Sequence, residues 1–129
     1  MTGVEAVPPR LRQVGAVCLW GLKVMLAGVF FAAAVAKLAG HPMMVSEFEA
    51  IGLGQGFRLL TGVVEAAAAL MLIWPATVFA GALILLAVCA GAFVAQAGPL
   101  HGDLVHVVVL AAMLLPVLWE SRPAGLCQA

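Results

Sequence analysis

Long apolar stretches alternate with short polar ones along the chain. A helix rises about 1.5 Å per residue, so about 20 apolar residues cross a hydrocarbon core of about 30 Å. Only helices satisfy their backbone hydrogen bonds in lipid as separate short segments. The pattern therefore predicts an all-α membrane protein, a bundle of four transmembrane helices. The expected spans are residues 14–36, 57–74, 76–95 and 103–119.

The longest connection, residues 37–56, contains a second helical signal. The Gly-His-Pro motif at 40–42 ends the first span, and its proline suits the first position of a new helix. Apolar side chains then recur at helical spacing, at Met44, Phe48 and Ile51. We therefore expect a short amphipathic helix at the membrane surface between the first and second spans.

Polar residues flank this apolar region at both ends. They divide the chain into a polar tail at 1–13, a transmembrane domain at 14–122 and a disordered tail at 123–129. Loops rich in lysine and arginine stay in the cytoplasm. Both termini are therefore expected in the cytoplasm, because one side holds three basic residues and the other two. These are Arg10, Arg12 and Arg122 on the first side, and Lys37 and Arg58 on the second.

The composition supports the membrane class and excludes others. The chain has 129 residues, 65% hydrophobic and 9% charged, with a mean hydropathy of +1.18. Soluble domains are about 25% charged. The net charge is zero and no basic patch occurs, so the lipid bilayer is an expected partner and nucleic acid is not.

Glu65 is a lone carboxylate inside the second apolar stretch. An ionisable group at membrane depth is costly and is usually paired, turned toward the bundle interior and functional. Arg58 lies seven residues earlier on the same helix face, with Glu65 about 10 Å deeper. Lys37 ends the first span, and its flexible stem can extend inward. We therefore expect Lys37 to be the counter-ion of Glu65.

Other polar residues fall at the same outer end of the bundle. Asp103 is expected to cap the fourth span, and His106 lies one turn later. Two structural alternatives stay open: Glu65 could only hold helices together, and His106 could interact only with Asp103. The predicted polar pocket, roofed by the 42–51 helix, comprises Glu65, Lys37, His106, Arg58, Gln96 and Asp103.

Metal and thiol chemistry have weak signals. His101, Asp103 and His106 form a conceivable but unspecific ligand set, and no metal site is expected. The three cysteines contain no Cys-x-x-Cys pair, although Cys18 and Cys89 could meet in space. Small residues recur every fourth position, either because helices approach closely there or because the helices are rich in alanine. They are Gly28, Ala32, Ala36 and Gly40, and Ala87, Gly91 and Ala95.

Several short motifs follow one another in a set order. They are Phe31-Ala32-Ala33-Ala34-Val35-Ala36-Lys37-Leu38, Gly40-His41-Pro42, Phe48 with Ile51-Gly52-Leu53, and Leu60-Thr61-Gly62-Val63-Val64-Glu65. Over about residues 20–122 this order resembles the DoxX-like family of small four-helix bacterial membrane proteins. The resemblance implies one four-helix bundle and implies that Lys37 and Glu65 occupy positions that belong to the family pattern. It also implies links to quinone-coupled sulfur oxidation, thiol and oxidative-stress systems, or membrane-protein assembly.

We therefore expect a small ligand-binding or accessory subunit of a membrane redox system in the bacterial inner membrane, not an enzyme on its own. Its pocket would bind a quinone-like or other small amphipathic molecule. Glu65 would accept a proton or hydrogen bond, Lys37 would be its counter-ion, and His106 a second donor. The alternatives are a non-catalytic assembly scaffold and a small oligomeric transporter. Partner membrane subunits or further copies of the chain are possible in each case.

Overall fold

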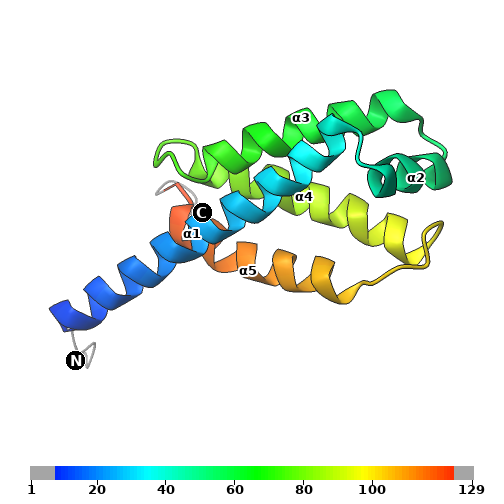
Figure 1. The fold of residues 1–129 in the computed structure, drawn as a ribbon. Helices are drawn as coiled ribbons and strands as arrows, with labels where there is room; N and C mark the ends of the chain where they lie inside the picture. Colours follow the sequence, from blue (N-terminus) through cyan, green and yellow to red (C-terminus); the bar gives the residue numbers. More distant parts are fainter. Residues whose placement is uncertain (1–7, 124–129) are drawn as a thin grey trace.

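The computed structural model describes residues 8–123, and its regular structure there is entirely helical (Figure 1). This confirms the all-α prediction. The first helix begins inside the stretch 1–13 that was expected to be a tail, and most of the tail expected at 123–129 lies outside the described residues. The helices are α1 (Pro9–Ala39), α2 (Pro42–Ile51), α3 (Gln55–Met71), α4 (Val78–Ala97) and α5 (Val105–Ser121).

Glycine and proline set the ends of α1 and α2. Gly40 ends α1 with φ 74°, and Gly52 ends α2 with φ 84°. Glycine adopts this left-handed backbone without a steric penalty, which makes it a common helix stop. Pro42 opens α2, and Nδ1 of the preceding His41 accepts a hydrogen bond from the Met43 amide at 3.3 Å. The Gly-His-Pro motif therefore acts as a stop followed by a start.

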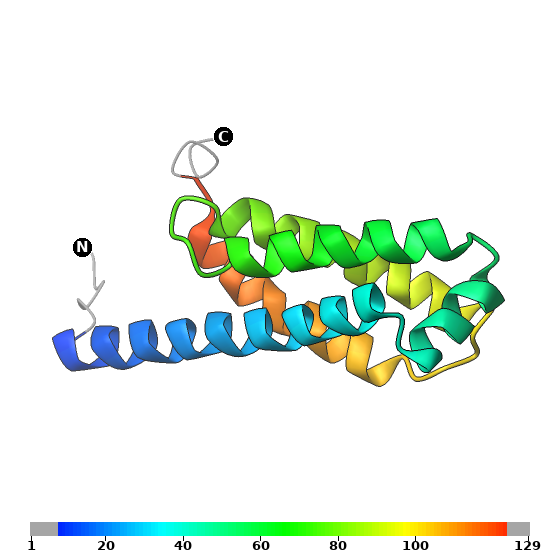
Figure 2. The same cartoon turned by 45° about the horizontal axis from the view of Figure 1, so that its top comes forward.

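The four longer helices pack in a ring. Helix α1 packs on α3, α3 on α4 and α4 on α5, and a smaller contact joins α5 to α1. Helix α2 packs mainly on α3, at the end where α1 stops and α3 begins (Figures 1 and 2). Successive long helices run in opposite directions, so the start of α1 and the end of α5 lie at the end opposite α2.

Glycine permits a close helix contact in the core. A Cβ atom added at Gly81 of α4 would lie 2.8 Å from Met71 Cβ and 2.9 Å from the Ala68 carbonyl oxygen of α3. Real Cβ atoms do not approach other atoms this closely, so only glycine fits without a shift. Large apolar side chains fill the core around this contact: Leu26, Leu72, Leu85, Leu114 and Val117 are fully buried.

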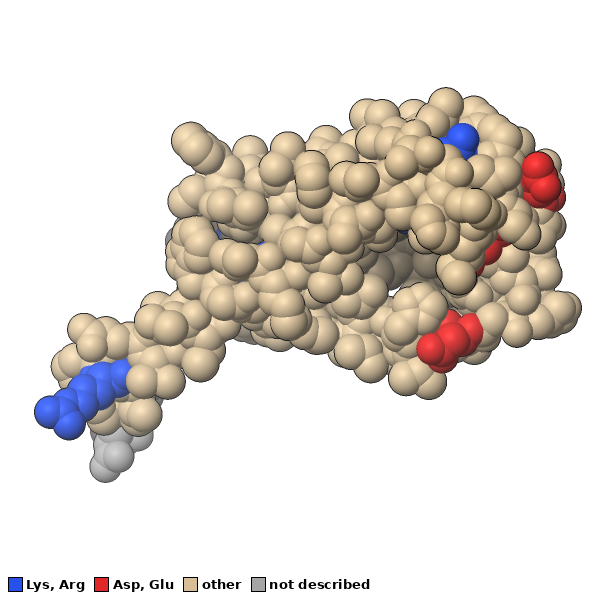
Figure 3. Space-filling view, viewed as in Figure 1, with Lys and Arg blue, Asp and Glu red and all other residues tan. Residues whose placement is uncertain are grey.

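Large apolar side chains also cover the outside of the molecule. Exposed valine, leucine, phenylalanine and tryptophan occur on all four long helices or directly beside them. Figure 3 shows almost no charge on the visible face between the two ends. Helices α1 and α4 are long and apolar enough to cross a membrane, and α5 is a shorter apolar helix. An apolar outer surface of this extent suits lipid rather than water.

Candidate functional site

An ion pair joins α1 to α3. The Lys37 ammonium donates to Oε2 of Glu65 at 2.6 Å. Glu65 is 2% exposed, whereas the Lys37 side chain is 13% exposed. A buried carboxylate is costly unless a charge partner and hydrogen bonds compensate it. The two residues that the sequence brings forward therefore partly neutralise each other between the helices.

Gly62 lets the two helices approach at the level of this pair. It lies on α3, one turn before Glu65. A Cβ atom at this position would be 3.0 Å from Leu38 Cγ and 3.2 Å from Lys37 Cβ. The missing side chain at position 62 thus leaves room for the α1 backbone, which places the lysine stem beside the carboxylate.

Arg58 binds the end of α1. This side chain is 9% exposed. Its Nη1 donates to the Lys37 carbonyl oxygen, and its Nε donates to Gln55 Oε1 at 2.6 Å. The last carbonyls of a helix carry partial negative charge, so a guanidinium is favourable there. Arg58 is therefore linked to the ion pair through the backbone of Lys37.

Gln55 extends these contacts to α2, a role that sequence reasoning missed. Its Nε2 donates to the Val45 carbonyl oxygen at 3.2 Å, while its Oε1 accepts from Arg58. The available signal was its spacing, because residues three apart on a helix are neighbours. One series of contacts therefore runs from Glu65 through Lys37, Arg58 and Gln55 to α2.

Replacing Gln55 with methionine should loosen α2. The change removes both side-chain hydrogen bonds, each worth about 1 kcal/mol. Backbone amides of 42–51 should then exchange with solvent about fivefold faster, while those of α4 stay unchanged. Hydrogen–deuterium exchange with mass spectrometry measures this, with exposed Glu49→Gln as the control on α2 itself. Unchanged exchange in Gln55→Met would show that packing alone holds α2.

The structure does not join the other three predicted pocket residues to Glu65. His106 is exposed, and its Nδ1 lies 3.5 Å from Asp103 Oδ2, so the alternative pairing expected of it is present. Leu104 rather than Asp103 is the capping residue of α5, although Asp103 Oδ1 accepts from the Val105 amide at 2.9 Å. Gln96 lies against Gly102 in the loop after α4. These side chains have local partners instead.

Residues 8–123 contain no group of three His, Cys, Asp or Glu side chains placed to hold a metal ion. Cys18 is exposed on α1, Cys89 is buried in α4, and both are free thiols. Cys127 lies outside the described residues. The possible pairing of Cys18 with Cys89, which the sequence left open, is therefore not formed among the described residues.

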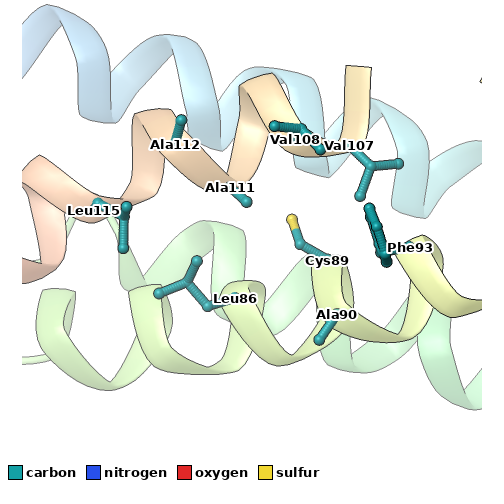
Figure 4. A pocket seen from close by; sticks show the side chains of 9 residues that line it. All are labelled: Leu86, Cys89, Ala90, Phe93, Val107, Val108, Ala111, Ala112 and Leu115. Carbon is teal, nitrogen blue, oxygen red and sulfur yellow. The ribbon is translucent and has the colours of Figure 1, made fainter. Parts of the chain in front are cut away.

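An apolar groove of about 370 Å³ runs between α4 and α5 (Figure 4). The Cys89 sulfur points across it toward α5. The groove contains no charged residue, and neither Glu65 nor Lys37 lines it, so it is separate from the ion pair. Its lining is Leu86, Cys89, Ala90 and Phe93 from α4, and Val107, Val108, Ala111, Ala112 and Leu115 from α5.

Comparison with known proteins agrees with the resemblance drawn from the motifs. No curated protein and no solved structure matches the chain. The model of the DoxX-like family matches residues 21–120, which include the ion pair and most of the helical region. This match confirms the expected family, and with the apolar helices it identifies a membrane protein. The chain belongs to the DoxX-like family.

Proposed function

We propose that the chain crosses the bacterial inner membrane four times, with residues 14–122 as the membrane domain. Helices α1, α3, α4 and α5 would span, and α2 would lie at the outer surface. The alternating helix directions and the exposed apolar side chains support this arrangement. Helices α3 and α5 have 17 residues each, about 25 Å, which is close to the hydrocarbon thickness.

Both termini would lie in the cytoplasm. Arg10 and Arg12 are in the first turn of α1 and Arg122 directly follows α5, so three basic residues gather at one end. Lys37 and Arg58 are at the other end, and both are engaged in partly buried contacts. The exposed Trp74 and the Trp119 ring, over which Arg122 lies at 3.7 Å, suit the membrane interface at the cytoplasmic end.

Within the membrane, the protein would act as a ligand-binding or accessory subunit of a redox system, binding a quinone-like or other small amphipathic molecule. The Lys37–Glu65 ion pair is the observation that carries this proposal. Well-packed apolar residues often replace a buried ion pair without loss of stability. A pair at this depth therefore suggests a role in binding. Glu65 would hold the Lys37 ammonium in place and accept a proton, with Arg58 completing the site.

Removing both charges together tests the binding role. Protein purified in mild detergent should carry a small amphipathic molecule, detectable by native mass spectrometry. The double variant Lys37→Met, Glu65→Gln should keep the fold but carry much less of it. The matched control is Lys23→Met, Glu120→Gln, which makes the same two substitutions outside the site. Equal loads in all three proteins, or none in any, would contradict the proposal.

Two exposed glycines favour a second candidate function, that of a non-catalytic scaffold that binds partner membrane proteins during assembly. A Cβ atom at Gly28 of α1 or Gly91 of α4 would meet nothing within 4 Å. Small residues on an outer helix face allow a partner helix to approach closely. If this function is correct, Gly28→Leu and Gly91→Leu should abolish co-purification of partner subunits while the double charge variant retains them.

A further inference from the structure

The charges around the ion pair do not balance. Lys37 and Arg58 are positive, and Glu65 is the one carboxylate paired with either of them among residues 8–123. The partners of Arg58 are neutral: the Lys37 carbonyl oxygen and Gln55 Oε1. The nearby helix α2 carries Glu47 and Glu49, but neither forms an ion pair with Arg58. The cluster therefore holds a net charge of +1.

The end of α1 offsets only part of this charge. A helix C-terminus is equivalent to about half a negative elementary charge, and Arg58 lies directly on it. Arg58 also stands in the first turn of α3, and a helix N-terminus carries the opposite partial charge, so the cluster remains positive. In a poorly polar environment an uncompensated charge is costly, and a negative group nearby would lower that cost.

Arg58 retains the donors to bind such a group. A guanidinium has five N–H donors in a planar fork that matches carboxylate and phosphate oxygens. Two of the five are engaged by Lys37 and Gln55 in the described contacts. The surface is hollowed beside α2, next to the end of α1 (Figure 3). Both cations keep a small exposed fraction, 13% of the Lys37 side chain and 9% of Arg58, so neither is sealed from the surface.

We infer that the site binds an amphiphile with an anionic head group, a carboxylate or phosphate, which pairs with Arg58 and the partly neutralised Lys37. This inference rests on the proposed binding function and specifies the class of ligand. The apolar surface around the site suits an acyl or isoprenoid tail. Glu65 repels the head group electrostatically, although it also orients Lys37.

Two fluorescent probes with the same tail test the head-group charge: cis-parinaric acid and its methyl ester. They would be titrated into the purified full chain in nonionic detergent at a pH that keeps the acid ionised. The acid should bind about tenfold more tightly than the ester. This ratio of dissociation constants is what one hydrogen bond to a charged group usually contributes. Arg58→Gln should remove this preference with little change for the ester, and Arg58→Lys should restore part of it.

Glu65→Gln should change the affinity for the acid in the direction opposite to Arg58→Gln. It removes the negative charge of the cluster, so the acid should bind more tightly than to the wild type while the ester does not. This variant keeps the test decisive if Arg58→Gln fails to fold, as judged by circular dichroism. Equal binding of acid and ester to the wild type would overturn the inference of an anionic head group, but it would leave the proposed binding function standing. Binding of neither probe would overturn both this inference and the proposed function.

Discussion

Lys37→Met should destabilise the protein by about 3–5 kcal/mol, the usual cost of removing one partner from a buried ion pair. The change leaves Glu65, which is 2% exposed, without the ammonium that lies 2.6 Å away. The carboxylate then has to take up a proton or draw in water. Unfolding followed by circular dichroism in detergent measures the loss as a lower unfolding midpoint.

Glu65→Gln should cost less than Lys37→Met. The lysine is near the end of α1, is partly exposed, and has a long stem that can turn its ammonium toward water. The double variant Lys37→Met, Glu65→Gln should recover most of the stability, because no buried charge is then left alone. Lys23→Met is the control for loss of a lysine from the same helix. A wild-type midpoint in Lys37→Met would show that the pair contributes nothing to stability.

Gly81→Ala should be the second most damaging change, at about 1–3 kcal/mol. The new methyl group would lie 2.8 Å from Met71 Cβ and 2.9 Å from the Ala68 carbonyl oxygen. Neither neighbour is the end of a flexible side chain, so α3 and α4 have to move apart. Thermal unfolding of the purified variant measures the cost.

Gly91→Ala, on the same helix, should not destabilise the protein. Nothing lies within 4 Å of an added Cβ at this position. Alanine is favoured over glycine inside a helix by up to about 1 kcal/mol, so this variant should be as stable as the wild type or more stable. If Gly81→Ala and Gly91→Ala shift the midpoint alike, the close approach of α3 and α4 does not limit stability.

The sequence predicts helix ends well where glycine or proline marks them. Helix α2 was expected at 42–51 and occupies Pro42–Ile51, because proline suits the first turn of a helix and Gly52 readily ends one. The expected span 57–74 is instead Gln55–Met71. The sequence stays apolar through Ile73 and Trp74, although the helix ends before them. Hydropathy indicates whether a residue suits an apolar environment, but it does not indicate where the helical hydrogen bonds end.

The site was partly predictable for a related reason. A charge at membrane depth requires a partner, which led from Glu65 to Lys37. The depth of a residue does not, however, reveal its direction around the helix axis. On α5, Val107 is buried while the adjacent His106 is exposed, so depth alone could not tell which of the two faces the bundle interior. Gln55 was missed because polar residues at helix starts are common.

The contacts of Arg58 tie three helices together at one end of the bundle. Its guanidinium fastens the end of α1 to α3 and, with Gln55, to α2. The contact that joins α5 to α1 is smaller than the contacts between the other neighbouring helices of the ring. Loss of the Arg58 guanidinium would therefore release the end of α1 from α3 and weaken the hold on α2 at the same time.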